Sequence, residues 1–573
     1  MPDIYQFIKY DSETSIESLK TKCESGAIIC FDLEDSIFNW IDETKGPVLK
    51  QNYRKWLNII LRKLNAGAIP LKIGIRLNSF DSGEQQLDLE SIPEGTKIHT
   101  FLVPKVETAF DIDSLAERLQ AKNLNISEII PIIESGKGLN NLERIVSCKN
   151  PVLKMGFGHC DYNLSIGAFP FFHQDSTEYW KWVNRIVSVL TSHNCTFINS
   201  AYLNLSDSAF FQSMLAHLQF LCQGNFGQFT LSHQQTLLCN TFSKQPESIA
   251  EIGRNRLDLS INKEMLLSLK STFEAENKGQ GFSMTSDTKT LISPQEYISA
   301  KQHLASWKEN TIHFTFVGGC FPVQSDILFE DVFHRILAKK AEDNLNVNFN
   351  VNIIRYEKFS NCLQKIANYH EHRPINYLVF HIRPEPYLRI IKLYYKYLNS
   401  GNKLHGSLNL PFLGILNPEK YDLLSVGRRN GYAARKSRSG LYDALINCNY
   451  MLGYLIGNHY YAKYKYLSLV KDVIEYCNNQ KIKVIILGPA IRSETFFEAI
   501  LSKKLEKFMS ESLKNADANY IFGLGKQQDK GKKYFQENGI HATELYHTLI
   551  ANRVYDAIGE EETGQHIHNV PCD

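Results

Sequence analysis

Short apolar runs alternate with amphipathic segments along the first half of the chain. Eight of these runs predict β-strands, because they are rich in branched and aromatic residues and are bounded by polar or turn-forming residues. The predicted strands cover residues 4–9, 27–33, 71–77, 100–105, 128–133, 153–158, 195–203 and 228–232. Between them lie segments with helical spacing of apolar residues, such as 112–119 and 180–190. Eight strand–helix units in about 240 residues match the size of one (β/α)8 barrel.

The same alternation resumes after residue 310. Strands are predicted at 312–317, 349–354, 375–381, 483–487 and 520–522. Five such strands with intervening helices predict a doubly wound α/β domain of the flavodoxin type. Between the halves, residues 274–290 are rich in Glu, Asn, Lys, Gly and Ser, and Pro294 suits the first turn of a helix. We therefore expect a barrel over 1–275, a lid or linker over 276–309 and the second domain over 310–573.

Composition and charge give no reason to expect a nucleic acid or a membrane as partner. The 63 Lys and Arg residues nearly balance the 61 Asp and Glu residues, which leaves a net charge of +2. No stretch approaches the roughly 20 apolar residues that a spanning helix needs, and residues 1–5 lack the features of a signal peptide. The twelve cysteines include no CxxC pair. This pattern is typical of reduced thiols in a cytoplasmic protein.

Charged side chains recur where the predicted barrel strands end. They are Asp32, Glu34, Arg76, Lys105, Glu134 and Asp161. A barrel carries its active site at these carboxyl ends. Glu134 and Asp161, at the mouths of neighbouring strands, can share a hard cation such as Mg²⁺, and the planar fork of Arg76 suits a substrate carboxylate. Such a site would polarise a 2-oxo acid or thioester and stabilise an enolate. Ordinary solvated loop charges are the alternative interpretation.

Five motifs in this half come in the order and spacing of a known family. They are Phe31-Asp32-Leu33-Glu34-Asp35-Ser36, Arg76-Leu77-Asn78-Ser79, Val103-Pro104-Lys105-Val106-Glu107, Pro131-Ile132-Ile133-Glu134-Ser135-Gly136 and Gly156-Phe157-Gly158-His159-Cys160-Asp161-Tyr162. Over about residues 1–306 the chain resembles the HpcH/HpaI aldolase and citrate lyase beta-subunit superfamily of TIM barrels.

The resemblance implies a Mg²⁺-dependent enzyme that makes or breaks C–C bonds in citryl, malyl or related acyl-thioesters and 2-oxo acids. It implies Glu134 and Asp161 as metal ligands and Arg76 as the residue that holds the substrate. Lys105, Asp32 and Glu34 are expected to line the substrate site beside the metal. CoA or an acyl carrier would be a partner, and the barrel would form a homo-oligomer.

Three departures from the family pattern favour a diverged lyase that acts on an unusual acid. The glycine-rich turn after the first strand is replaced by Lys9-Tyr10-Asp11-Ser12. Gln228 and Ser232 stand where the family has a lysine and a histidine. The lid acid of the thioester lyases falls in Leu291-Ile292-Ser293-Pro294, where Ile292 takes its place. His159 is predicted as a third ligand or proton shuttle, or as a simple hydrogen-bonded histidine.

The second domain opens with Gly318-Gly319-Cys320 after its first strand and closes with Asn538-Gly539-Ile540-His541. These blocks resemble those of the SGNH/GDSL hydrolases, with Cys for Ser and Asn for Asp. The resemblance implies Cys320 as nucleophile, His541 as base and Asn538 as the residue that orients His541, because a thiolate needs less base assistance than a serine alkoxide. A catalytically inactive domain is the alternative. His381 or Arg383 is expected to supply the missing oxyanion contact or to bind a carboxylate.

A bifunctional biosynthetic enzyme is the function that these features favour. The barrel would be a C–C lyase or aldolase for a carboxylic acid, and the second domain an acyl hydrolase or acyltransferase. The alternatives are a thioesterase or hydrolase with a non-catalytic barrel, and a non-enzymatic scaffold. A basic loop around Arg428, Arg435 and Arg438 is expected either to bind phosphate or to be a solvated insertion.

Overall fold

The computed structural model divides into two compact units. Unit 1 comprises Met1–Arg256 and Ile261–Trp307, and unit 2 comprises Leu257–Ser260 and Lys308–Asp573. The described residues are 2–67, 71–150, 152–242, 252–277, 281–285, 289–319, 321–324, 327–356, 359–398, 404–408, 410, 440–491, 496–524, 528–529, 532–535 and 542–563.

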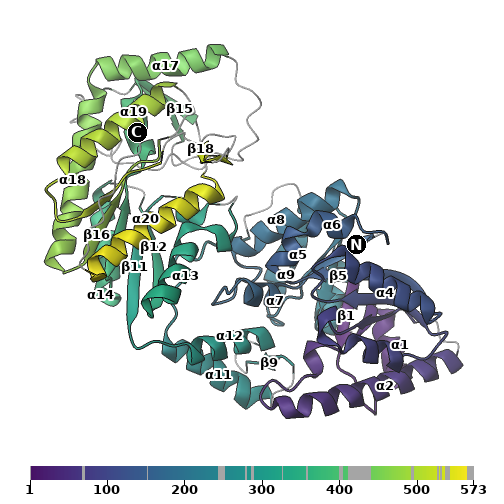
Figure 1. Cartoon of the computed structure of the whole chain (residues 1–573). Helices are drawn as coiled ribbons and strands as arrows, with labels where there is room; N and C mark the ends of the chain where they lie inside the picture. The colour runs from purple at the N-terminus through teal and green to yellow at the C-terminus, as the bar shows by residue number, and fades with distance from the viewer. Residues whose placement is uncertain are drawn as a thin grey trace. The chain divides into compact units, whose positions relative to one another are not determined.

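Unit 1, which contains the elements labelled β1 and β5 in Figure 1, is built on a closed barrel of parallel strands. These strands follow one another in chain order. The strands are β1 (Asp3–Ile8), β2 (Ile28–Asp32), β3 (Ile73–Arg76), β4 (Lys97–Val103), β5 (Asn125–Ile133), β6 (Lys154–Phe157), β7 (Thr196–Asn199) and β8 (Phe226–Thr230). The barrel closes where β8 pairs with β1, with Gly227 opposite Asp3. The predicted (β/α)8 barrel is confirmed, and each of its eight strands overlaps a predicted one.

Helices connect the strands and extend the unit beyond the barrel. They are α1 (Ile16–Glu24), α2 (Gly46–Ala66), α3 (Gln85–Ser91), α4 (Ala109–Ala121), α5 (Gly136–Asn140), α6 (Leu142–Val146), α7 (His159–Ser165), α8 (Thr177–Ser192), α9 (Ser208–Leu221), α10 (His233–Thr241), α11 (Lys263–Asn277) and α12 (Pro294–Ala305). The hairpin of β9 (Ser283–Met284) and β10 (Leu291–Ile292) lies between α11 and α12 in the chain. Helix α12 begins at Pro294, as the sequence predicts.

The barrel interior is filled by alternate residues of its strands. Tyr5, Ile28, Cys30, Leu102, Ile130, Ile132, Ile198 and Phe229 form one buried apolar cluster. Successive side chains of a strand point to opposite faces, so each strand contributes every second residue to this core. At the carboxyl ends of β2 and β5, the next residues in the inward series are Asp32 and Glu134, which replace apolar side chains by carboxylates.

Unit 2 contains a five-stranded parallel sheet with helices on both faces. The strand order is β12 (Asn348–Arg355), β11 (Thr311–Gly318), β13 (Tyr377–His381), β16 (Lys483–Leu487) and β17 (Asn519–Ile521). Counted along the chain, this is the 2-1-3-4-5 order of flavodoxin-like sheets. The predicted doubly wound sheet is therefore confirmed.

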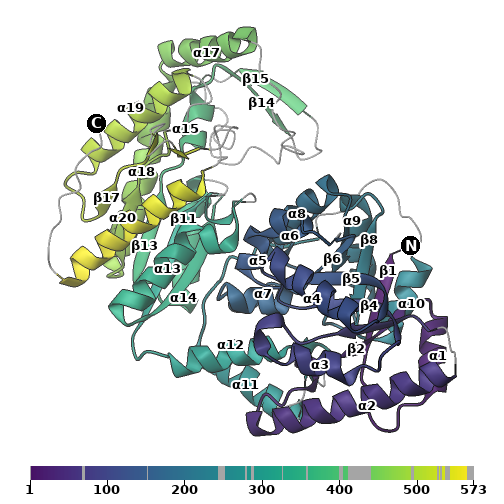
Figure 2. The same ribbon diagram turned by 45° about the vertical axis from the view of Figure 1, so that its right-hand side comes forward.

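Two apolar layers cover this sheet. Helices α13 (Phe333–Leu345) and α20 (Glu544–Thr563) run side by side over one face (Figure 2). Helices α14 (Phe359–His372), α15 (Pro384–Ile391), α18 (Asn458–Asn479) and α19 (Phe496–Ser512) pack on the other face. The remaining described elements are α17 (Gly440–Leu455) and the hairpins β14 (Tyr394–Leu398) with β15 (Leu404–Leu408) and β18 (Gln528–Asp529) with β19 (Lys532–Lys533).

The segment Leu257–Ser260 belongs to unit 2 although both of its flanks belong to unit 1. It pairs with the edge strand β12, where Leu259 N–H donates to Val351 O (3.0 Å) and Ile353 N–H donates to Leu257 O (2.9 Å). These bonds cover part of an exposed sheet edge, which reduces the risk of edge-to-edge association. Nothing in the local sequence pattern predicts this excursion.

Candidate active site

Charged residues gather at the carboxyl end of the barrel because the inward alternation continues past the apolar core. Asp32 ends β2 and lies opposite Arg76 in the register of β2 with β3. Glu134 follows β5, and Asp161 lies in the first turn of α7, directly after β6. Asp32 and Glu134 are buried, with exposed fractions of 3% and 4%. Water therefore cannot fully solvate these charges, and protein groups must stabilise them.

Arg76 holds Asp32 in a two-point ion pair. Arg76 Nε donates to Asp32 Oδ1 (2.7 Å), and Arg76 Nη2 donates to Asp32 Oδ2 (2.5 Å). Burial alone would raise the pKa of Asp32, but the charge and hydrogen bonds of Arg76 bring it below its usual value. The third nitrogen, Nη1, lies 3.2 Å from Glu34 Oε2. All three guanidinium nitrogens of Arg76 therefore face a carboxylate, two of them Asp32 and the third Glu34.

Asn78 fixes the loop that directly follows Arg76, the last residue of β3. Its side-chain amide donates to Leu33 O (2.7 Å) in the loop after β2 and to Asp88 Oδ2 (2.8 Å), which also accepts from Asn78 N–H (2.7 Å). Arg54 Nε in turn donates to Asp88 Oδ1 (2.8 Å). The motif Arg76-Leu77-Asn78-Ser79 thus combines one residue that faces the site with one that ties two neighbouring loops together.

Lys105 places its ammonium group among the carboxylates. Nζ lies 3.1 Å from Glu34 Oε1, 3.2 Å from Asp161 Oδ1 and 3.9 Å from Asp35 Oδ1. Burial opposes its charge, but these carboxylates raise the pKa of Lys105 above its usual value. The residue adopts a left-handed backbone with φ of 53°, a conformation that costs energy for a side chain other than glycine. It lets Lys105 N–H donate to Glu134 Oε2 (3.0 Å) as well.

Glu134 occupies space that only a glycine neighbour leaves open. A Cβ on Gly158 would lie 2.1 Å from Glu134 Oε1 and 2.6 Å from its Cγ. Any larger residue after β6 would therefore displace the Glu134 carboxylate. Gly158 in the motif Gly156-Phe157-Gly158 is therefore required by the space that the Glu134 side chain occupies.

The carboxylates outnumber the cations around them. Asp32, Glu34, Asp35, Glu134 and Asp161 face Arg76 and Lys105. Burial and the neighbouring charges raise the pKa of Glu34 to about 8 and that of Asp161 to about 6. Burial and repulsion from Asp161 and Glu34 raise the pKa of Glu134 as well. The site therefore carries an anionic surplus when its carboxyl groups are ionised, and an added cation would relieve it.

This surplus predicts an unusual pH dependence of stability. The pKa of Glu34 is about 8 in the folded protein against an ordinary value of 4.5, and that of Asp161 is about 6 against 3.8. The folded state binds more protons than the unfolded state between these values, so its free energy of unfolding falls as pH rises from about 4 to about 8. We expect the melting temperature of the protein in EDTA to fall over this window.

Mg²⁺ should restore the melting temperature at about pH 8 and have little effect at about pH 5, where protons already offset the surplus. Circular dichroism melts with EDTA and with Mg²⁺ at both pH values measure this. A melting temperature that rises with pH in EDTA would contradict the prediction.

Helix α12 contributes two residues that the sequence did not single out. Gln295 is buried, and its Nε2 donates to Asp35 Oδ2 (2.6 Å) and to Asp161 Oδ2 (2.8 Å). Glu296 Oε1 lies 3.3 Å from His173 Nε2. Both follow Ser293, the residue that caps the amino end of the helix, and the only sequence signal was the capping pattern Ser-Pro-Gln-Glu at 293–296. Their spatial partners lie more than a hundred residues away in the chain.

His159 is a buried, hydrogen-bonded residue. Its Nδ1 lies 2.5 Å from Ser200 Oγ, and its Nε2 lies 3.0 Å from His173 Nδ1. Burial and the charge of His173 lower the pKa of His159 well below its usual value. Protein atoms thus contact both ring nitrogens of His159, an arrangement typical of a structural histidine.

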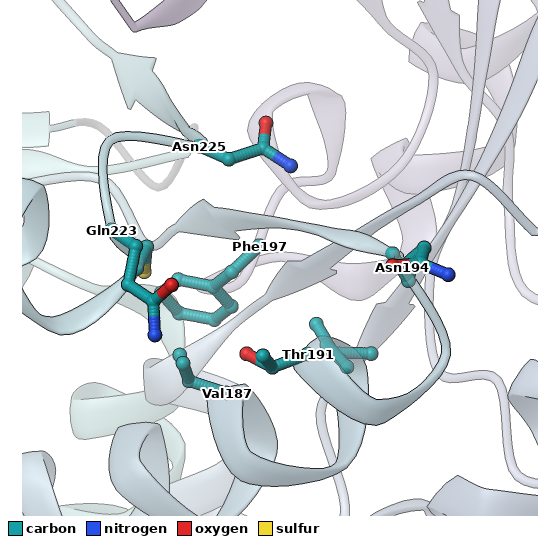
Figure 3. Close-up of a pocket in the computed structure, with 9 residues that line it drawn as sticks. Val187, Thr191, Asn194, Phe197, Gln223 and Asn225 are labelled. Carbon is teal, nitrogen blue, oxygen red and sulfur yellow. The ribbon is translucent and has the colours of Figure 1, made fainter.

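A pocket of about 200 Å³ lies at the opposite end of the barrel (Figure 3). Val187, Leu190, Thr191, Asn194, Cys195, Phe197, Cys222, Gln223 and Asn225 line it. Asn194 and Cys195 precede β7, and Asn225 precedes β8, so the pocket opens at the amino ends of these strands. It is therefore separate from the charged cluster at the carboxyl ends.

The predicted catalytic residues of the second domain, Cys320, Asn538 and His541, lie outside the described residues. So does the basic loop around Arg428. The described neighbours include Gly319, where a Cβ would lie 2.5 Å from Arg383 Nε. The guanidinium of Arg383 therefore packs directly over the turn that follows β11. The backbone N–H of Arg383 donates to Tyr466 Oη (2.6 Å).

No group of three or more His, Cys, Asp or Glu side chains within the described ranges is arranged to hold a metal ion. No helix in the part of the chain that the structure describes is both long and apolar enough to cross a membrane.

Comparison with known proteins finds a family match within the barrel unit. Residues 18–218 match the model of the HpcH/HpaI aldolase/citrate lyase family. This stretch is an HpcH/HpaI aldolase/citrate lyase domain. It contains Asp32, Arg76, Lys105, Glu134 and Asp161, so the charged cluster belongs to the family domain, whereas Gln295 and Glu296 lie beyond the matched residues.

Individual relatives are distant. The L-malyl-CoA/beta-methylmalyl-CoA lyase of Rhodobacter capsulatus is 24% identical over 248 residues, a match that covers 39% of this chain and 74% of the relative. Among solved structures, RipC of Yersinia pestis is 19% identical with a TM-score of 0.32 and covers 43% of this chain and 96% of its own. The citrate lyase beta subunit of M. tuberculosis complexed with oxaloacetate and magnesium is 18% identical with a TM-score of 0.33, covering 42% and 96%.

Proposed function

We propose that the barrel is a Mg²⁺-dependent C–C lyase or aldolase that acts on a carboxylic acid. The observation that carries this proposal is the excess of buried carboxylates around the Lys105 ammonium at the carboxyl end of a barrel of this family. A site that places five carboxylates around two cations is poorly suited to a merely structural role, because their mutual repulsion destabilises the fold.

The donor atoms fit a hard divalent cation. Both oxygens of Glu34 are buried and face cations, Oε1 the ammonium of Lys105 and Oε2 the guanidinium of Arg76. The ion-pair partners of Lys105 Nζ are carboxylate oxygens of Glu34, Asp35 and Asp161. Mg²⁺ commonly takes only one or two protein carboxylates and completes its shell with water and substrate oxygens, so the lack of a three-ligand group among the described residues is compatible with it. Glu134 and Asp161 would hold the ion, and its chemistry is to polarise a carbonyl and stabilise the enolate that forms.

The protein residues would bind and orient the acid. Arg76 and Lys105 are the cationic side chains of the cluster and would bind a substrate carboxylate in competition with Glu34, which pairs with both. The side chain of Lys105 is 37% exposed. Asp32 keeps Arg76 charged and fixes the plane of its guanidinium. Glu34 lies between the two cations and limits their movement.

We infer that the acid differs from the thioesters of the malyl-CoA lyases. Gln228, which stands where the family has a lysine, is fully buried. Its Nε2 donates to Ser200 O (2.9 Å) and Phe229 O (2.7 Å), and its Oε1 accepts from Asn199 (2.9 Å). An amide bound in this way supplies no charge to a phosphate or thioester. A homo-oligomer formed through the barrel stays a prediction.

The test is a lyase assay on the full chain with Mg²⁺. The panel comprises malyl-CoA, citryl-CoA and the free acids malate and citrate, and the readout is release of a 2-oxo acid, trapped as its phenylhydrazone. We expect at least one of the free acids, malate or citrate, to release a 2-oxo acid. EDTA should abolish this release. Activity on the thioesters alone would support the lyase and contradict the inferred substrate. No release from any compound would contradict the lyase itself.

As a second function, we propose that unit 2 hydrolyses or transfers an acyl group. Its support is the 2-1-3-4-5 strand order and the position of Arg383 over Gly319, the residue before Cys320. Arg383 would favour the thiolate of Cys320, because a nearby cation stabilises this nucleophilic form. Cys320 would attack the acyl carbon and expel the alcohol or thiol of the ester. His541 would take the proton of the Cys320 thiol and pass it to the leaving group, and Asn538 would orient His541. Water or an acceptor alcohol would then release the acyl group from Cys320.

This second proposal predicts a reactive Cys320. Iodoacetamide should modify Cys320 faster than Cys448, an exposed thiol in α17 that serves as the internal reference. His541→Ala should slow the labelling of Cys320 without changing that of Cys448, because only Cys320 depends on the imidazole. Peptide mapping measures both rates. Labelling of Cys320 no faster than that of Cys448 would favour the catalytically inactive domain.

A further inference from the structure

Helix α12 presents Gln295 to the charged cluster because of how the helix begins. Ser293 Oγ accepts from Glu296 N–H (3.2 Å), and Glu296 Oε2 accepts from Ser293 N–H (2.8 Å). This reciprocal capping box and Pro294 in the first turn fix the start of the helix. Gln295 therefore lies in the first turn, with its direction set by the cap.

Gln295 uses one amino group to bridge two carboxylates from different loops. Nε2 donates to Asp35 Oδ2 (2.6 Å), after β2, and to Asp161 Oδ2 (2.8 Å), after β6. The opposite oxygens face Lys105, with Asp161 Oδ1 at 3.2 Å and Asp35 Oδ1 at 3.9 Å from Nζ. Each carboxylate thus gives one oxygen to Gln295 and turns the other toward the centre of the cluster.

Helix α12 is held firmly enough to act as a fixed support. Ala300 packs in an apolar cluster with Phe169, Phe171 and Leu266. Tyr297 stacks on Phe273 with ring centroids 4.4 Å apart, and its hydroxyl donates to Glu274 Oε1 (2.8 Å). Glu296 reaches His173, as described above. These contacts come from α11 and from the loop after α7, so they anchor the helix independently of Gln295.

The neutral amide also suits the charge of its surroundings. A carboxylate at position 295 would add to the anionic surplus, and an ammonium would compete with the cation that the surplus attracts. An amide can donate two hydrogen bonds without changing the net charge. The residue therefore orients acidic side chains and leaves their charge available.

We propose that Gln295 is a positioning residue for the cation site, which α12 completes from within the same chain. By holding the Oδ2 atoms of Asp35 and Asp161, it turns the Oδ1 atom of each toward the centre of the cluster. In this way it would set the direction of Asp161, one of the two proposed ligands. The inference rests on the proposed Mg²⁺ site, and it extends the site beyond residues 18–218 to a helix that the family match does not include. Replacing a residue that orients a metal ligand typically lowers metal affinity about 10- to 100-fold.

The test compares Mg²⁺ affinity in two variants of the full chain. Gln295→Met keeps the length of the side chain and its helix propensity but removes both donated hydrogen bonds. Gln302→Met makes the same change at an exposed position of the same helix and serves as the control. Calorimetric titration with MgCl₂ should show a dissociation constant raised about tenfold in Gln295→Met and unchanged in Gln302→Met.

A merely structural role would give a different result. If Gln295 only anchors α12, Gln295→Met will lower the melting temperature and leave the Mg²⁺ affinity of the folded protein unchanged, and this would overturn the inference. Gln295→Asn, which is one methylene shorter and reaches only one carboxylate, covers the case in which Gln295→Met does not fold, and its dissociation constant should also rise. Failure of the wild-type chain to bind Mg²⁺ would overturn the metal site itself. If Gln295→Met and Gln295→Asn both bind Mg²⁺ as tightly as the wild-type chain, only the role of Gln295 is overturned.

Discussion

Glu134→Gln and Asp161→Asn are each expected to weaken Mg²⁺ binding by about 100-fold or more and to abolish lyase activity. The reason is that two carboxylates supply the protein's share of the ligands, so neutralising one removes half of the direct ligand charge. The same change should raise the melting temperature of the metal-free protein above pH 7. Burial and mutual repulsion raise the pKa of Glu134 and of Asp161, and removing one charge relieves the repulsion.

This combination of lost binding and gained stability distinguishes a cation site from a structural cluster. Calorimetry measures the affinity, and thermal melts in EDTA measure the stability. Glu117→Gln, at an exposed position on α4, is the control for loss of one acidic charge and should change neither quantity. Unchanged affinity in both site variants, or a loss of stability in EDTA, would contradict the assignment of Glu134 and Asp161.

Arg76→Lys is expected to lower kcat/KM by roughly 30- to 1000-fold, which corresponds to about 2–4 kcal/mol of transition-state binding. A lysine keeps the charge but cannot contact Asp32 at two points and at the same time present a third nitrogen to a substrate. The variant should therefore raise KM for the acid as well as destabilise the fold. Asp32 would lose one of its two charge-assisted hydrogen bonds in a buried position, which is costly.

Arg54→Lys provides the matched control. Arg54 is also an arginine with little exposure, and its Nε donates to Asp88 Oδ1 (2.8 Å). Its described ion pairs are with Glu84 and Asp88, which are not part of the charged cluster. Its replacement should lower stability and leave KM unchanged. If the two variants lose activity only in proportion to the fraction unfolded, measured by urea titration, Arg76 is a structural arginine and the substrate contact must be sought at Lys105.

Several elements of the site follow from position along a strand. Apolar residues alternate inward in β2 and β5, so the first polar residues after them, Asp32 and Glu134, fall at the carboxyl end of the barrel. The same reasoning indicated Arg76, Lys105 and Asp161, because each comes at the end of an apolar run. Periodicity of this kind is a local property of the sequence. It suffices to predict where strands lie, which side chains face inward and which residues fall at the ends of the strands.

The sequence alone therefore determined the two sheets, their approximate boundaries and the end of the barrel where charge would collect. Tertiary structure decided which charges meet: Arg76 with Asp32, Lys105 with Glu34 and Asp161, and Gln295 with two loops that lie far from it in the chain. It also decided the left-handed backbone of Lys105 and the pairing of Leu257–Ser260 with β12. Hydrophobic spacing fixes the face on which a side chain lies, but the partner of a buried polar group depends on which distant segments the fold brings within hydrogen-bond reach.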